Sequence, residues 1–209
     1  MWWNSLPKWQ KTLVWVNALV IGASSVYYVA TENFEFLVYV VVLLSIGGLV
    51  LGTIKRSNFP PLILWGLSIW GWGHMAGGSI PVGESVLYRL ILVPLYDAGD
   101  GEFVLLKYDQ AIHFYGFAIA TLIVYHLLKP YLNERTNWKV VYPIIALCGM
   151  GLGVVNELVE FLAVISVPET GVGGYFNTSL DLVFNTLGAI AAVFYIHARR
   201  VKRLSPESD

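Results

Sequence analysis

The sequence has little charge and almost no cysteine, and both shortages limit what the protein can be. Charged residues make up 13% of its 209 residues, whereas about 25% is usual in soluble domains. The net charge is -1, so the chain lacks the overall positive charge that attracts proteins to nucleic acid. The single cysteine, Cys148, excludes an intrachain disulfide and a cysteine-based metal site. The sequence also lacks a serine or cysteine nucleophile elbow and a glycine-rich phosphate loop, which disfavours acyl-enzyme and nucleotide chemistry.

Hydrophobic residues are abundant instead, at 56% of the chain, where soluble domains have about 45–50%. A helix needs roughly 20 mostly apolar residues to cross the hydrocarbon core of a bilayer. Six stretches meet that requirement, at residues 9–30, 34–54, 60–78, 109–128, 140–167 and 180–198. The sequence therefore predicts an all-α, polytopic membrane protein: a single six-helix transmembrane domain over residues 1–200, followed by a short, disordered cytoplasmic tail at 201–209.

The basic residues predict how the chain is oriented. With the N-terminus in the cytoplasm, eleven of the thirteen Lys and Arg residues fall on the cytoplasmic side, as the positive-inside rule requires. Both termini are therefore expected inside, in a plasma (inner) membrane. Lys8 and Lys11 precede an apolar run that could also be a signal peptide. Because this run exceeds the 7–15 residues usual for a signal-peptide core, we expect the first helix to be retained.

One long connection, residues 79–108, joins the third and fourth predicted helices. Its apolar middle, residues 86–93, is too short to span and is interrupted by Arg89, which favours a re-entrant or interfacial segment. We expect this connection to lie as an extracytoplasmic lid over the mouth of the bundle. Residues 97–102 are acidic but lack the spacing of an EF-hand, so they are interpreted as a solvated turn.

An ionisable side chain inside an apolar membrane helix costs free energy, so each one indicates a structural or functional role. Asp109 and His113 are four residues apart and share a helix face, as do Asp181 and Asn185. Glu157 and Glu160 are three apart near the end of the fifth helix, and His74 lies near the end of the third. With the predicted orientation, all seven side chains occupy one shallow layer on the extracytoplasmic side.

Small residues continue the same helix faces below this layer. They are Gly116 and Ala120, Gly149 and Gly153, and Gly188 and Ala192. Stripes of small residues allow membrane helices to approach closely. We therefore expect the polar faces to point at one another and not at lipid.

Three motifs in order carry a resemblance to a known family. They are Asp109-Gln110-Ala111-Ile112-His113-Phe114, Asn156-Glu157-Leu158-Val159-Glu160-Phe161 and Asp181-Leu182-Val183-Phe184-Asn185-Thr186-Leu187-Gly188-Ala189. Together they resemble the signature of the YjdF-like bacterial inner-membrane proteins and, more distantly, of the VanZ-like proteins. The sequence departs from these patterns at Glu160, where VanZ-like proteins usually carry Gln, and at Asn177, where YjdF-like ones often carry an acid. The resemblance implies a polytopic plasma-membrane protein, linked in the VanZ-like case to resistance against lipid-bearing glycopeptide antibiotics, and it implies no reaction.

Three interpretations of the polar layer remain open from the residues. The first is a structural hydrogen-bond network between helices. The second is a hydrolase or transferase that acts on lipid headgroups or lipid-linked envelope precursors, with its catalytic candidates at Glu157, His113, Asp109, Asp181, Glu160 and Asn185. The third is a small transporter, which is disfavoured because the first three helices carry no counterpart of the acidic motifs.

A divalent metal ion is the cofactor that this layer could hold. The candidate ligands are His113, Asp109, Glu157 and Asp181. Without a metal, crowded carboxylates cannot all stay ionised, and we expect Glu157 to carry a proton and donate a hydrogen bond. Either way, the sequence predicts that Asp109, His113, Glu157, Glu160 and Asp181 surround one small polar cavity.

Overall fold

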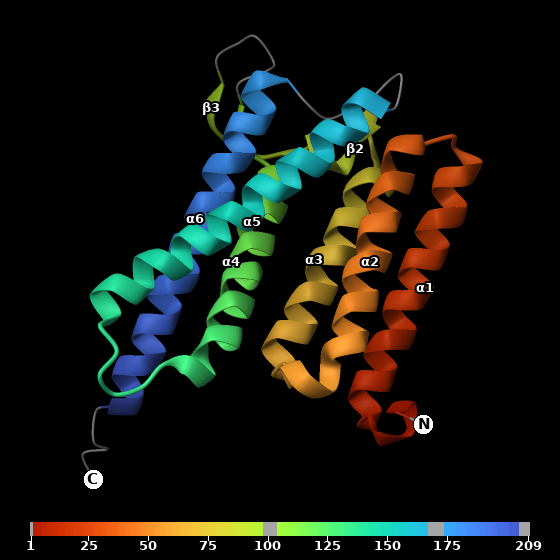
Figure 1. Cartoon of the computed structure of the whole chain (residues 1–209). Helices are drawn as coiled ribbons and strands as arrows, with labels where there is room; N and C mark the ends of the chain where they lie inside the picture. The colour runs from red at the N-terminus through yellow and green to blue at the C-terminus, as the bar shows by residue number, and fades with distance from the viewer. Residues whose placement is uncertain (1, 98–103, 167–173, 205–209) are drawn as a thin grey trace.

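A computed structural model of the chain describes residues 2–97, 104–166 and 174–204. Within these residues the fold is a bundle of long helices with short strands gathered at one end (Figure 1). The helices are α1 (Lys8–Ala30), α2 (Phe34–Ser57), α3 (Pro61–Ser79), α4 (Tyr108–Leu128), α5 (Trp138–Ser166) and α6 (Tyr175–Leu204). Short 3-10 turns lie at η1 (Trp2–Ser5), η2 (Leu87–Arg89) and η3 (Lys129–Tyr131).

Local signals set where the helices begin and end. The side chain of Asn33 caps α2 by accepting a hydrogen bond from the backbone N–H of Phe36. At the other end of α2, Asn58 adopts a left-handed conformation with a φ of 45°, which stops the helix. Pro61 then begins α3, where a missing backbone N–H has no cost. The predicted bounds of α1 to α5 are accordingly close to the observed ones.

The predicted bounds of α6 are wrong at both ends. The helix begins at Tyr175 and not at residue 180, because the polar residues before Asp181 form its first turns. It continues to Leu204, beyond the apolar segment, so the chain is helical from 201 to 204 where disorder was expected. The rest of the predicted tail, residues 205–209, lies outside the described residues.

Five of the six helices are long and apolar enough to cross a membrane: α1, α2, α4, α5 and α6. α3 is long enough as well, but its Trp and Gly residues and His74 lower its hydropathy. The chain is therefore a multi-pass membrane protein with five candidate spans, and a sixth span at α3 stays a prediction. The first turn of α1 and the last turn of α6 lie at the same end of the bundle, opposite the strands (Figure 1).

The connection between α3 and α4 contains two small hairpins. In the first, β1 (Pro81–Val82) pairs with β2 (Ser85–Val86), and in the second, β3 (Ile91–Asp97) pairs with β4 (Val104–Lys107), both antiparallel. Residues 98–102 of the predicted acidic turn lie outside the described residues. The buried side chain of Gln110 joins β4 to α4, because it donates to the Val104 carbonyl at 3.0 Å and accepts from the backbone of Lys107 at 3.1 Å.

Glycines allow α4, α5 and α6 to approach closely. A Cβ atom added to Gly188 would lie 2.1 Å from the backbone carbonyl oxygen of Phe114, and one added to Gly153 would lie 2.9 Å from Cβ of Asn185. A Cβ at Gly149 would meet the hydroxyl of Thr121. The expectation that these small residues face neighbouring helices is confirmed, although Gly116 faces Trp70 of α3.

Candidate functional site

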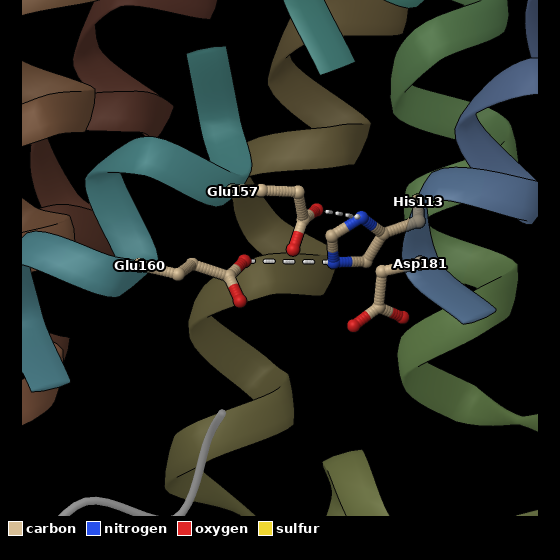
Figure 2. A group of neighbouring side chains, drawn as sticks. All are labelled: His113, Glu157, Glu160 and Asp181. Atoms are coloured by element: carbon tan, nitrogen blue, oxygen red, sulfur yellow. Dashed lines mark ion pairs between the residues drawn. The ribbon is translucent and has the colours of Figure 1, made fainter. Parts of the chain in front are cut away.

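The predicted polar residues lie at the end of the bundle that carries the strands. Asp109 and His113 occupy the first turns of α4, and Glu157 and Glu160 occupy the last turns of α5. Asp181 lies in the second turn of α6 and Asn185 one turn further along. Figure 2 shows His113, Glu157, Glu160 and Asp181 converging from three different helices. All four side chains are buried.

The imidazole of His113 is the centre of the group. Its Nε2 atom lies 3.5 Å from Oδ1 of Asp109 and 3.6 Å from Oε1 of Glu160, and its Nδ1 atom lies 3.5 Å from Oε1 of Glu157. No Lys or Arg pairs with these three carboxylates within residues 2–97, 104–166 and 174–204. The histidine therefore has carboxylates on both of its ring nitrogens.

Asn185 decides which ring nitrogen of His113 carries a proton. Its amide nitrogen donates to Oε1 of Glu157 at 3.3 Å, so its carbonyl oxygen faces Nδ1 of His113 at 3.0 Å. A carbonyl oxygen can only accept, so Nδ1 must be the N–H donor. In neutral His113 the lone pair is then on Nε2, which faces Asp109 and Glu160. Metal-binding histidines are commonly oriented in this way, by a hydrogen bond from their other nitrogen.

Two carboxylate oxygens of the group lack a hydrogen-bond partner among the described residues. They are Oε2 of Glu157 and Oδ1 of Asp181, and both are buried. Glu157 is 7% exposed and Asp181 is 1% exposed, so both side chains are almost fully covered by the described residues. Buried polar atoms are nearly always paired, and an orphan of this kind indicates a bound ion or an internal water.

The spacing of the group suits a small cation. One ligand atom each from His113, Glu157, Glu160 and Asp181 lies within 4.8 Å of all the others. Two ligands at about 2.1 Å from one tetrahedral ion lie about 3.4 Å apart. The distances from Nε2 of His113 to Asp109 and Glu160 are close to that value, and both exceed the roughly 2.7–2.9 Å of a charge-assisted hydrogen bond.

The structure places the predicted ligands in a slightly different grouping. Glu160 belongs to the compact group of four, whereas Asp109 lies outside it, pairs with His113 at 3.5 Å and is 13% exposed. His74 lies apart from the group, and its Nδ1 atom is hydrogen-bonded to the Tyr88 hydroxyl of η2. Burial raises the pKa of Tyr88 well above its usual value, and the nearby charge of Asp109 adds to this effect, so the hydroxyl stays protonated.

Three amide residues that hold the group in place were not among the predicted site residues. Asn156 donates to Oε1 of Glu160 at 2.8 Å, and Asn177 donates to Oδ2 of Asp181 at 2.7 Å. Gln110 anchors the beginning of α4 beside Asp109. Asn156 and Asn177 each precede their carboxylate by four residues, which is the same spacing that pairs Asp109 with His113. This signal could have identified both residues.

A cavity of about 310 Å³ reaches the group from the side, between α5 and α6. Glu157 and Glu160 form part of its wall, together with apolar side chains of both helices. A second cavity, of about 370 Å³, lies among α1, α2 and α3, and no Asp, Glu, His, Lys or Arg lines it. Of these two cavities, the one between α5 and α6 is therefore the one lined by ionisable side chains.

A family model described as "Predicted membrane protein (DUF2238)" matches residues 12–202. The chain belongs to this family of predicted membrane proteins. The match includes α2 to α5, nearly all of α1 and α6, and every residue of the polar group. No curated protein and no solved structure matches the chain significantly. Family membership thus agrees with the apolar helices and assigns no reaction to the buried group.

Proposed function

We propose that this DUF2238 family member binds one divalent cation at His113, Glu157, Glu160 and Asp181. The observation that supports this most strongly is the pair of buried, unpartnered oxygens on Glu157 and Asp181, inside a group whose ligand atoms lie within 4.8 Å. Carboxylates gathered in a low-dielectric interior repel one another unless a cation or protons neutralise them. Asp109, 3.5 Å from Nε2 of His113, is the next closest candidate ligand.

The proposed role of the cation is metal-assisted hydrolysis or group transfer on a lipid headgroup or a lipid-linked envelope precursor. A bound divalent ion turns water into a nucleophile near neutral pH and polarises a phosphoryl or carbonyl oxygen. Asn185 holds the His113 ring so that Nε2 faces the ligands, and Asp181 and Glu160 are fixed by Asn177 and Asn156.

Metal binding is tested on the purified full-length protein in detergent. The metal content of the protein as purified is measured by inductively coupled plasma mass spectrometry, and zinc is titrated into chelator-stripped protein by calorimetry. We expect one equivalent per chain, and an affinity at least about tenfold lower in D181N and E160Q. The matched control is E84Q, in the exposed turn between β1 and β2. Equal zinc affinity in wild type and D181N, or no binding at all, contradicts the proposal.

A structural network is the second candidate, and the amide–carboxylate hydrogen bonds at Asn156, Asn177 and Asn185 favour it. Such bonds join or rigidify helices without any chemistry. The two candidates differ in one measurable respect. A purely structural network predicts that D181N lowers the unfolding temperature while the wild type binds no metal.

The finer assignments are proposals as well. These are the YjdF-like affiliation, the more distant VanZ-like one, and a plasma-membrane location with six spans and both termini in the cytoplasm. The orientation rests on the distribution of Lys and Arg. In a C148S background, a maleimide that cannot cross membranes should label E84C in intact cells and E134C only after the membrane is opened. Both positions are exposed, and they lie between different pairs of helices. The reverse pattern contradicts the orientation.

A further inference from the structure

The cavity between α5 and α6 has two chemically different ends. Its inner wall includes the carboxylates of Glu157 and Glu160, behind which lie His113 and Asp181. The rest of its wall is mostly apolar, and it comes from Val154, Leu158, Phe161, Val164 and Leu182 together with Gly174 and Thr178. The cavity is open on one side and not enclosed. Its shape is thus that of a pocket with a polar base and an apolar mouth.

The mouth faces the membrane and not water. Leu158 and Phe161 are 55% and 58% exposed, and Val154 is 48% exposed. These residues lie on α5, one of the candidate membrane spans, so their free surfaces meet lipid hydrocarbon. A molecule that enters between these side chains therefore comes from the bilayer.

We propose that this cavity, which we name the lateral pocket, admits the headgroup of a phospholipid from the side. The proposal deepens the proposed function and rests on it, because it identifies the substrate class of the same site. About 310 Å³ is at the lower end of ligand pockets, at roughly 300–1,000 Å³, so a whole phospholipid does not fit. The headgroup occupies the polar base, and the acyl chains stay in the bilayer beside Leu158.

Phosphatidylethanolamine has suitable chemistry for the polar base. Its phosphate carries the oxygen ligands that a divalent cation accepts. Its ammonium group is a cation that Glu157 and Glu160 attract. The cavity among α1, α2 and α3 has no charged side chain among its described lining residues, and one of its two amides, Asn17, already bonds Ser68 and Trp72. The lateral pocket is therefore the better site for an amphiphile.

The test uses the full-length protein reconstituted in vesicles that contain phosphatidylethanolamine with a photoactivatable diazirine near the start of one acyl chain. After illumination, the labelled residues are located by mass spectrometry. We expect saturable labelling of α5 and α6 around the lateral pocket, which excess unlabelled phosphatidylethanolamine removes.

Two leucines of α5 provide a matched pair of variants. Leu158 lines the pocket and Leu162, one turn away, does not, although their exposures are 55% and 56%. L158W fills the mouth and should lower saturable labelling about tenfold, whereas L162W should leave it unchanged. V154W and V155W repeat the comparison one turn earlier, in case either leucine variant folds poorly. Equal, non-saturable labelling in all four variants would show only bulk lipid around the helix and would overturn the proposal.

Zinc titration of the same variants separates this proposal from the one on which it rests. L158W should bind zinc as the wild type does, because the ligands lie behind the mouth. Zinc binding with no pocket-specific labelling would leave the metal site intact and overturn the lateral pocket. Pocket-specific labelling without zinc binding would support a lipid site and contradict the metal-dependent function.

Discussion

The glycines of α1 and α2 and three glycines of α4 to α6 have opposite surroundings. In α4 to α6, Gly188, Gly153 and Gly149 bring helices together so closely that an added methyl group would meet a neighbouring helix. In α1 and α2, a Cβ at any of four glycines, Gly22, Gly47, Gly48 and Gly52, would meet no described atom within 4 Å, and two of them, Gly47 and Gly48, line the 370 Å³ cavity. The helices with these close contacts also carry the buried carboxylates of the polar group, Glu157, Glu160 and Asp181. Close packing and the polar site thus belong together, because ligand atoms from three helices can meet only if those helices touch.

The largest effect is expected where the close contact is with backbone. In G188A the new methyl group would lie 2.1 Å from the Phe114 carbonyl oxygen, which cannot rotate away, and we expect the free energy of unfolding to fall by about 2–3 kcal/mol. G47A in α2 should be neutral or stabilise by up to about 1 kcal/mol through helix propensity. Thermal unfolding in detergent, followed by circular dichroism, measures both. Equal stability of the two variants would refute the contrast between these two sets of glycines.

The buried glutamates of the two halves should also differ. E157Q keeps the hydrogen bond from Asn185 and should fold, but it should lose turnover and bind zinc about tenfold more weakly. E157L leaves the Asn185 amide without an acceptor and should also lower the free energy of unfolding by about 2 kcal/mol. Glu35 is equally buried on α2, and E35Q is the control. An E35Q protein as defective in zinc binding as E157Q would locate the site elsewhere.

A smaller effect on zinc affinity is expected when buried amides of the two halves are replaced. N185L, similar in shape, removes the acceptor that orients His113, and zinc affinity should fall about tenfold, or about 1.4 kcal/mol. Asn17 is a comparable amide that links α1 to α3, and N17L should leave zinc affinity unchanged. Calorimetric titration of zinc into both variants measures the two affinities. Unchanged affinity in N185L would remove the orienting role assigned to this amide.

The smallest effect concerns two tyrosines. Y88F deletes the hydrogen bond to His74 and should lower the free energy of unfolding by about 1 kcal/mol. The Tyr39 hydroxyl is buried and has no partner among the described residues, so Y39F should be neutral or slightly stabilising. Chemical denaturation in mixed micelles compares the two. A larger loss in Y39F than in Y88F would contradict this hydrogen-bond assignment.

Helical spacing was sufficient to predict most of the fold and the convergence of the polar residues. The apolar runs located α1 to α5 because hydrocarbon imposes both length and composition on a span. The i,i+4 pairs Asp109–His113 and Asp181–Asn185 fixed which faces meet. The same rule missed the beginning of α6, because the polar residues 177–179 were interpreted as loop although Asn177 bonds Asp181 one turn later.

Other features depend on tertiary contacts that no local pattern shows. The strands between α3 and α4 are short, and β3 contains Pro94, so period-two alternation was too weak to predict a hairpin. The bond from Tyr88 to His74 joins residues fourteen positions apart in different elements. Glu160, and not Asp109, completes the compact group. The packing of α5 against α4 determines which carboxylates lie close together, and the spacing of residues within one helix does not specify this packing.

The site is completed by the last helix of the chain, and this order matters for biosynthesis. Domains form from the N-terminus during synthesis, so α4 and α5 enter the bilayer before Asn185 and Asp181 have been made. At that stage Glu157 and His113 lack the amide that bridges them, and an unpaired carboxylate in hydrocarbon is unfavourable. Docking of Gly188 against the Phe114 carbonyl supplies both the bridge and the close contact in one event. We therefore expect the nascent protein to be least stable in the interval before α6 docks.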